Sequence, residues 1–258
     1  MIKIILLGCF GRMGTAVQKA AALDAQMEIV AGVDIITPAG GVSFPIYTDV
    51  EQCQMPADVI IDFMPPSAIA DTKKLLKFAA ERQIPLILAT TALPEDVMEE
   101  VRAASEKVGI FVAANLSLGI GLLVNFLNKA AKLLNEAGFD IEIMEKHHNK
   151  KLDSPSGTAL LLAQSINQAL DGKMKIVTDR SHTQVERGKD EIGIHALRGG
   201  NIVGEHSVVF AGADEVVEFT HIAGSRDVFA TGAMKAAYFM KDKSPGLYGM
   251  QDLIESGM

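Results

Sequence analysis

The sequence predicts an α/β protein of two domains, a doubly wound parallel sheet followed by a second α+β domain on a mixed or antiparallel sheet. In the first half, buried apolar strands alternate with amphipathic helices, which is typical of a parallel sheet with helices on both faces. In the second half, strand-like runs follow one another with short turns, which favours antiparallel pairing. This change of pattern predicts a domain boundary near Ser117.

Composition excludes several classes of protein. A chain of 258 residues with 48% hydrophobic residues can bury a core, either as one large domain or as two modest ones. No apolar run approaches the ~18–20 residues of a membrane span, and the first residues are too short for a signal peptide. A net charge of −8 argues against nucleic acid or an anionic membrane as partner. Two cysteines without metal or disulfide spacing fit a reducing cytosol, so we expect a cytoplasmic protein.

The first strand and the turn after it form a candidate nucleotide site. An apolar run over residues 2–7 leads into Gly-Cys-Phe-Gly-Arg-Met-Gly at 8–14, a helix follows, and a second strand at 29–33 ends in Asp34. Strand, glycine turn, helix, strand and acid is the layout of a Rossmann-type dinucleotide-binding unit, in which glycines let the backbone approach a pyrophosphate. Asp34 would accept hydrogen bonds from the ribose hydroxyls. Phe10 stands where the common pattern has its second glycine, and by itself such a run also fits a plain tight turn.

Further strands of the first half end in loops that suit a ligand. Strands are expected at 57–63, 84–89 and 109–113, and helices from Ser67, as a possible cap, to 81 and at 94–107. The loops at 62–65, 89–91 and 114–117 follow the carboxyl ends of these strands, where open α/β sheets bind ligands. Taken singly, each fits an ordinary connection between strand and helix.

The second half is read as a helix from Ser117 to 137, a strand at 139–144 and a helix from 158 to 170. Residues 173–190 are polar and are expected to be irregular. Strands follow at 192–197, 205–210 and 215–222, the last two joined by a hairpin turn, and then a helix at 226–240 and a closing segment at 246–253.

Residues 145–159 are the segment around which we expect the rest of the chain to be organised. They place two histidines and three lysines before Ser156-Gly157-Thr158, which reads as the start of an apolar helix. Backbone donors at a helix start beside a cationic loop form a pocket for a carboxylate. His147 and Lys151 can hold or deliver a proton. A solvated charged loop is the alternative. No metal is expected, because the neighbouring lysines repel a cation and no third ligand has suitable spacing. His195, His206 and His221 are assigned structural roles.

The pattern Glu-x-His-His-x-x-Lys-x-Asp-x-Pro-Ser-Gly-Thr-Ala at 145–159 resembles the signature of the dihydrodipicolinate (4-hydroxy-tetrahydrodipicolinate) reductases of lysine biosynthesis. The Gly-Arg-Met-Gly core and the segments 197–200, 204–206 and 220–226 are also similar to that family. The resemblance implies NAD(P)H-dependent reduction of a cyclic dicarboxylate to tetrahydrodipicolinate in diaminopimelate and lysine biosynthesis. It also implies a homotetramer, a dinucleotide-binding domain at 1–117 completed by 230–258, and a substrate-binding and oligomerisation domain at 118–229.

The resemblance also implies roles for individual residues. His147 and Lys151 are the catalytic acids, and His148, Ser156, Gly157 and Thr158 hold the substrate carboxylates. The implied cofactor-binding residues are Gly8, Gly11, Arg12, Met13, Gly14, Asp34, Phe63, Ala89, Thr90, Thr91, Ala114, Asn115 and Leu116. The chain departs from the family at Ala89 and Ala92, where glycines are usual, at Met64, where a small or polar residue is usual, and at Leu116, where an aromatic residue is common.

Cofactor preference is predicted from Asp34. A carboxylate there bonds the ribose diol of NADH and repels the extra phosphate of NADPH, and Ile35 and Ile36 offer no cation in compensation. Arg12 partly compensates, so we expect NADH to be preferred and NADPH still to be used. Two other hypotheses stay open, an amino-acid dehydrogenase of related architecture and a nucleotide-sensing regulator. Neither explains the density of proton-capable groups at 145–159.

Overall fold

The computed structural model describes residues 1–36, 41–91, 93–182 and 184–257, so the departure expected at Ala92 lies outside the described residues. The chain forms two compact units. Unit 1 comprises Met1–Leu118 and Arg226–Met258, and unit 2 comprises Gly119–Ser225. One contains a parallel sheet and the other a mixed sheet, which confirms the predicted fold class. Within the described residues, no helix is long and apolar enough to cross a membrane.

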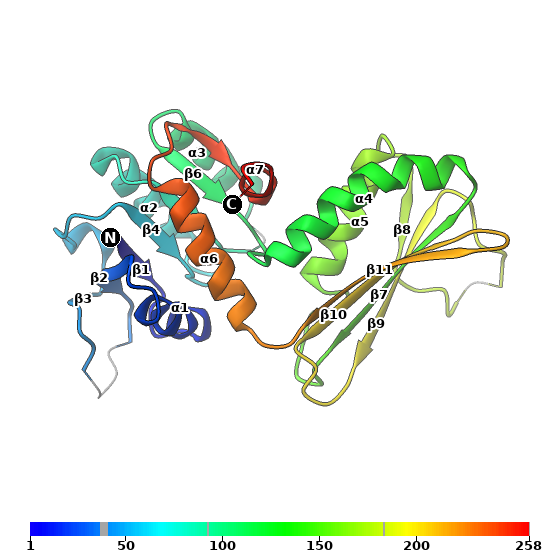
Figure 1. The fold of residues 1–258 in the computed structure, drawn as a ribbon, viewed down its shortest axis with the longest axis horizontal. Helices are drawn as coiled ribbons and strands as arrows, with labels where there is room; N and C mark the ends of the chain where they lie inside the picture. The colour runs from blue at the N-terminus through cyan, green and yellow to red at the C-terminus, as the bar shows by residue number, and fades with distance from the viewer. Residues whose placement is uncertain (37–40, 92, 183, 258) are drawn as a thin grey trace. The chain divides into compact units, whose positions relative to one another are not determined.

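Unit 1 is built on a seven-stranded parallel sheet of order β12-β6-β5-β4-β1-β2-β3 (Figure 1). The strands are β1 (Ile2–Leu7), β2 (Met27–Val33), β3 (Ile46–Tyr47), β4 (Val59–Asp62), β5 (Leu86–Leu88), β6 (Gly109–Val112) and β12 (Gly246–Tyr248). All six pairings are parallel. The central strands are continuous runs of Ile, Leu and Val because both faces of the sheet are covered.

Helices cover both faces of that sheet. They are α1 (Arg12–Ala22), α2 (Ile69–Arg82), α3 (Glu95–Ser105) and α6 (Asp227–Met240), with the short η1 (Val50–Gln52) and α7 (Met250–Glu255). The helices α1 and α6 pack in one hydrophobic core with Ile4 and Leu6, whereas α2 and α3 pack in the other with Ile5 and Leu7. This alternation along β1 follows from the two-residue period of a strand.

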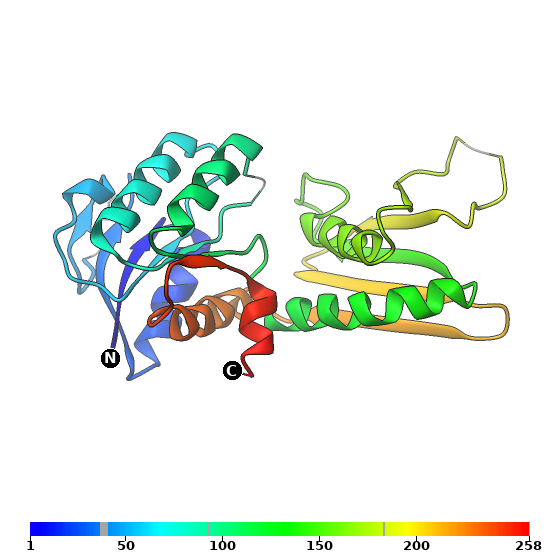
Figure 2. The ribbon, with the colours of Figure 1, turned by 90° about the horizontal axis from the view of Figure 1, so that it is seen from above.

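Unit 2 is a five-stranded mixed sheet of order β11-β10-β7-β9-β8 with two helices on one face (Figure 2). Its elements are α4 (Leu118–Glu136), β7 (Asp140–His147), α5 (Gly157–Ala169), β8 (Lys175–Val177), β9 (Glu191–Arg198), β10 (Gly204–Ala211) and β11 (Val216–Ala223). Strand β7 runs parallel to β9 and antiparallel to β10. The core between sheet and helices includes Leu127, Ile143, Leu162 and Phe210.

Several details of unit 2 differ from the sequence-based prediction. Strands β9 and β10 follow each other in sequence but do not pair, because β7 lies between them. The region 173–190, expected to be irregular, contains β8. Helix α5 and the long connection after β8 return the chain across the sheet, so β7, β8 and β9 run in the same direction. Residues 145–147, expected in a loop, end β7. In unit 1, α2 begins after Ala68 without a side-chain cap, so the expected cap at Ser67 is wrong.

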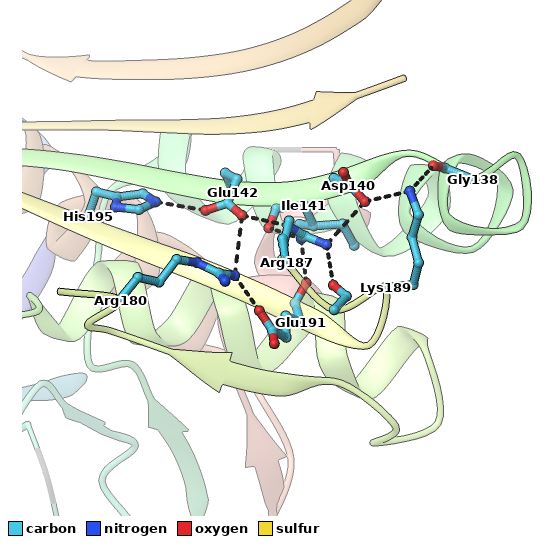
Figure 3. A network of polar contacts seen from close by, with 10 residues as sticks. Gly138, Asp140, Ile141, Glu142, Arg180, Arg187, Lys189, Glu191 and His195 are labelled. Atoms are coloured by element: carbon cyan, nitrogen blue, oxygen red, sulfur yellow. Dashed lines mark hydrogen bonds and ion pairs between the residues drawn. The ribbon is translucent and has the colours of Figure 1, made fainter. Parts of the chain in front are cut away.

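Arg187 holds the connection between β8 and β9 against the beginnings of two strands (Figure 3). Its Nε donates to Glu142 at 2.8 Å, and one terminal nitrogen donates to the carbonyl oxygens of Ile141 and Glu191 at 3.0 and 2.7 Å. The other terminal nitrogen donates to Asp140 at 3.1 Å. Glu142 also accepts from His195 at 2.7 Å, which places His195 in a structural network, as predicted.

Candidate active site

The glycine turn of unit 1 forms a narrow backbone cradle between β1 and α1. Gly8 has φ +66°, and a β-carbon at Gly14 would lie 2.2 Å from the carbonyl oxygen of Gly8. Only glycine fits at Gly14, and glycine is strongly favoured at Gly8. Helix α1 begins after Gly11, with Arg12 and Met13 as its first residues and no acidic residue in its first turn. The amide groups of this helix start are therefore suited to an anion.

Asp34 lies at the end of β2 and contacts the glycine turn directly. One carboxylate oxygen accepts from the backbone N–H of Phe10 at 2.8 Å, and the other accepts from Ile36 at 3.0 Å. Each oxygen keeps a second acceptor position. A pocket of about 300 Å³ opens beside Asp34 and includes Asp49, Asp71 and Lys74 in its lining. Lys74 forms an ion pair with Asp49 at 3.0 Å and lies 3.7 Å from Asp71. This lysine was not identified from the sequence.

A buried carboxyl group connects two of the loops that contain expected cofactor-binding residues. Asp62 is 0% exposed; its carboxyl oxygens accept from the N–H of Met64 at 2.8 Å and from the hydroxyl of Thr90 at 2.9 Å. The carbonyl oxygen of Asp62 accepts from Ala89 at 3.1 Å. Burial raises the pKa of Asp62 to about 6, although both hydrogen bonds oppose the rise. Phe63 follows directly and is half-buried.

The remaining loop residues of unit 1 have different environments. Thr91 and Ala114 are exposed, and the side chain of Asn115 accepts from the N–H of Ser117 at 2.8 Å. Leu116 is 3% exposed and belongs to the hydrophobic core. A β-carbon at Gly232 on α6 would lie 1.7 Å from its carbonyl oxygen, so α6 packs tightly there. The side chain of Leu116 is thus a core residue, and its expected contact with a cofactor stays a prediction.

In unit 2, the candidate residues surround the buried carboxylate of Glu145 on β7. Glu145 is 0% exposed, and each oxygen accepts two hydrogen bonds. One oxygen contacts Nδ1 of His147 at 2.6 Å and Arg198 at 2.7 Å, and the other accepts from Arg198 at 2.6 Å and from the N–H of Ser156 at 3.0 Å. Burial alone would raise the pKa of Glu145, but the bonds from Arg198, His147 and Ser156 outweigh it and keep the pKa below its ordinary value.

Ser156 caps α5 and connects it to a second histidine. Its Oγ accepts from the N–H of Ala159 at 3.1 Å and lies 3.0 Å from Nε2 of His206. The ring of His206 packs edge-on against that of His147, with centroids 5.1 Å apart. Burial, followed by the nearby His147, lowers the pKa of His206 to about 4, so this ring is neutral near pH 7. Sequence reasoning did not place His206 beside the candidate acid.

The other predicted residues of unit 2 lie close to this cluster in sequence. His147 is 8% exposed at the end of β7, and Lys151 pairs with Asp153 at 2.9 Å in the following turn. The carbonyl oxygen of His148 accepts from the N–H of Lys151 at 3.2 Å. Gly157 and Thr158 are the first residues of α5, and Gly157 is exposed with open space where a β-carbon would lie. A buried histidine and a helix start suited to a carboxylate are therefore joined through Glu145, which contacts both His147 and the N–H of Ser156.

Glu145 and Arg198 were missing from the predicted site. The sequence does carry a signal for Glu145, because Ile141, Ile143, Glu145 and His147 alternate along a strand with their side chains on the buried face. A charged residue in that series indicates a buried ion pair. The sequence gives no comparable signal for Arg198, because its contact with Glu145 depends on the register in which β7 pairs with β9.

Unit 1 has a parallel sheet with a glycine cradle and an acidic residue at the end of the next strand, and unit 2 buries titratable side chains. These features define a two-domain dinucleotide-dependent oxidoreductase. Comparison with known proteins narrows this class. The family models described as dihydrodipicolinate reductase, N-terminus, and dihydrodipicolinate reductase, C-terminus, match residues 2–116 and 119–254. The chain belongs to the dihydrodipicolinate reductase family, and the resemblance seen at 145–159 is confirmed.

Individual relatives agree over the full length. The 4-hydroxy-tetrahydrodipicolinate reductase of Caldanaerobacter subterraneus subsp. tengcongensis is 49% identical over 257 residues, covering 100% of both chains. That of Clostridium tetani is 42% identical over 257 residues, covering 99% of this chain and 98% of its own. The solved structure of dipicolinate-bound dihydrodipicolinate reductase from Paenisporosarcina sp. TG-14 has a TM-score of 0.80 at 23% identity, covering 98% of this chain and 99% of its own. This likeness shows the fold.

Proposed function

We propose that this chain reduces 4-hydroxy-tetrahydrodipicolinate with a nicotinamide dinucleotide bound to unit 1, and that His147 or Lys151 of unit 2 protonates the reduced intermediate. This activity follows from the family, because the chain belongs to the 4-hydroxy-tetrahydrodipicolinate reductases of lysine and diaminopimelate biosynthesis. One observation supports the assignment of residues: the buried, hydrogen-bonded His147 and the start of helix α5 belong to the same short segment.

The residues of unit 1 fit a dinucleotide. The backbone of Gly8, Gly11 and Gly14 forms a cradle that a β-carbon would fill, and Arg12 and Met13 begin the helix whose amides face an anion. Asp34 has acceptor positions for ribose hydroxyls. When bound, the cofactor supplies a hydride. The residues Phe63, Ala89, Thr90, Thr91, Ala114, Asn115 and Leu116 belong to the loops proposed to orient its reactive end.

NADH is proposed as the preferred cofactor, with NADPH still used. Three carboxylates, Asp34, Asp49 and Asp71, belong to the pocket beside the glycine turn. Its cation, Lys74, is balanced by two of them. A further phosphate would therefore meet a negative environment, which Arg12 offsets in part. The ratio of kcat/KM for the two cofactors tests this, and a strong preference for NADPH would contradict it.

His147 and Lys151 are proposed as the groups that supply the proton. Gly157 and Thr158 at the start of α5, with His148, are proposed to hold the carboxylates of the substrate, where backbone N–H groups and the helix dipole favour negative charge. Ser156 contributes by fixing this helix start, because its N–H and Oγ are both engaged inside unit 2. A dicarboxylate needs donors on two sides, and the cationic turn provides the second.

Substitution of the acids tests this assignment. His147→Gln and Lys151→Ala should each lower kcat by about 10²–10⁴-fold, since removing a proton donor raises the barrier to the chemical step with little effect on cofactor affinity. Lys150→Ala is the matched control, because Lys150 is an exposed lysine of the same turn, and it should cost far less. Near-normal turnover of His147→Gln or Lys151→Ala in folded, NADH-binding protein would refute the roles.

A homotetramer is proposed on the resemblance to the family and on the open face of unit 2. The two helices of this unit cover one face of its sheet (Figure 2). The opposite face carries large exposed apolar side chains, namely Met144, Leu197, Val216 and Ile222. Such a face favours association. Light scattering at micromolar concentration tests the proposal, and a monomer would overturn it.

A further inference from the structure

We propose that Glu145 and Arg198 are positioning residues that fix the ring orientation and the tautomer of His147, so that its Nε2 carries the transferable proton. The inference rests on the proposed role of His147 as an acid. In the step concerned, the imidazolium loses the Nε2 proton and keeps the bonding pair on nitrogen. The proton bonds to the electron-rich atom of the reduced intermediate, and the Nδ1 proton stays on the ring against Glu145.

The first argument is the saturation of the Glu145 carboxylate. Its four contacts come from three residues, and all are 3.0 Å or shorter. A carboxylate with four donors is an acceptor only, so Nδ1 of His147 must carry the hydrogen that it faces. The exchangeable position is then Nε2. A fixed tautomer of this kind is what makes a carboxylate–histidine pair effective in proton transfer.

The second argument is the environment of Nε2. A β-carbon at Gly204, the first residue of β10, would lie only 3.1 Å from this atom. Glycine therefore leaves space at the atom from which the proton departs. The other nitrogen faces a carboxylate that is 0% exposed, so proton exchange through Nδ1 has no open route.

The third argument is the reach of Arg198. Its two terminal nitrogens bind both oxygens of Glu145, and one of them also donates to the carbonyl oxygen of Asp153 at 2.8 Å. Asp153 in turn pairs with Lys151 at 2.9 Å. Arg198 thus keeps Glu145 ionised beside His147 and anchors the turn that carries the second proposed acid. A bidentate guanidinium suits this task because it holds a carboxylate in one plane.

The charged and titratable groups around His147 come from every strand near it. Glu145 on β7 and His206 on β10 contact the ring itself, Arg198 on β9 binds Glu145, and His221 on β11 and Lys151 in the turn after β7 lie near His206. Glu145 carries the negative charge of this set that contacts the ring. It is therefore the group expected to fix the orientation of the ring and to hold the Nδ1 hydrogen.

The test is Glu145→Gln. An amide in this place puts N–H hydrogens against at least one existing donor. His147 can then adopt the neutral tautomer that accepts at Nδ1 and carries its hydrogen on Nε2, and this neutral ring is too weak an acid to protonate the intermediate. We expect kcat to fall by about 10²-fold or more, with NADH affinity within about twofold of the wild type. The basic limb of the pH–rate profile should move to lower pH by about one unit or more, because the charge that stabilises imidazolium is lost. The solvent isotope effect on kcat should rise.

Glu136→Gln is the matched control. Glu136 is an exposed glutamate at the end of α4, one of the two helices that pack against the sheet. The same chemical change there should leave kcat and the pH limb unaltered. Arg198→Lys keeps the charge but loses the bidentate contact, and it should give an intermediate loss of kcat with a smaller shift of the pH limb.

Folding is checked by hydrogen exchange in β7 and α5. If Glu145→Gln does not fold, the double variant Glu145→Gln/Arg198→Met, which removes both buried charges, takes its place with the same expected loss of turnover. Turnover within about threefold of the wild type in folded protein would overturn the inference. A loss without a moved pH limb or isotope effect would overturn it too, since general loosening gives that result. If His147→Gln itself keeps its turnover, the proposed function fails; if only Glu145→Gln does, the positioning role alone fails.

Discussion

Asp62→Asn should stabilise unit 1 at neutral pH and remove a pH dependence of its unfolding. The pKa of Asp62 rises from the ordinary 3.8 to about 6 through burial, so the folded unit binds this proton more tightly than the unfolded chain does. The native state of the wild type consequently loses stability as pH rises through this interval. The full shift corresponds to about 3 kcal/mol, of which about 2 kcal/mol falls between about pH 4.5 and pH 8.

The new amide fits the existing contacts. Its oxygen can accept from the N–H of Met64, and its nitrogen can donate to Thr90, whose hydroxyl then donates to the carbonyl oxygen of Met64 at 3.2 Å. All three tyrosines lie in unit 1 and the chain has no tryptophan, so tyrosine fluorescence follows the unfolding of this unit alone.

In urea titrations, the midpoint of the variant relative to the wild type should increase by roughly 1 M between about pH 4.5 and pH 8. Asp49→Asn is the control, because hydrogen bonds from Glu51 and Lys74 lower the pKa of Asp49. Asp49 is therefore ionised in both states above about pH 4.5, and the difference between Asp49→Asn and the wild type should stay nearly constant between about pH 4.5 and pH 8. A difference between Asp62→Asn and the wild type that does not change with pH would refute the reasoning.

Three further outcomes are expected. In the wild type, unit 2 should lose about 3 kcal/mol of stability as pH falls from about 6.5 to about 4, because the folded His206 ring resists protonation. His206→Gln should remove this loss, and hydrogen exchange in β10 measures it. Ser156→Ala should lower the stability of α5 by about 1 kcal/mol because the helix loses its cap, and hydrogen exchange should become faster only in the first turn of α5 and its neighbours. A uniform acceleration of exchange throughout unit 2 would contradict this. Gly14→Ala should weaken NADH binding by about tenfold or more in a titration, because its β-carbon would meet the glycine turn; unchanged affinity would contradict a cofactor cradle there.

Elements with a strong local signal were predictable from the sequence. Strands β1, β2, β4, β5 and β6 are uninterrupted apolar runs, and the helices beside them have a clear apolar face, so these elements were predicted to within a few residues at the ends. The short strands β3 and β12 were not predicted. The glycine turn was predictable for the same reason, because the conformation of Gly8 and the close approach at Gly14 leave few other residues possible. Family resemblance then supplied the expected roles of the site residues.

Features that depend on contacts distant in sequence were not predictable. Arg198 reaches Glu145 across 53 residues, and only the parallel register of β7 with β9 brings them together. The place of β9 between β7 and β8 has no local signal, since short turns and apolar alternation are shared by parallel and antiparallel strands. Likewise, Asp62 was visible as a strand end, but its burial against Thr90 depends on the neighbouring strand β5.

The division of the chain has a consequence for the order in which the molecule is made. Unit 2 is one continuous segment, whereas unit 1 is interrupted between Leu118 and Arg226. During synthesis, the whole of unit 2 emerges from the ribosome before α6 and β12 do. It can therefore close its core while unit 1 still lacks the helix that covers one face and the strand that pairs with β6. Until those two elements emerge, the partly formed dinucleotide fold keeps apolar surface uncovered.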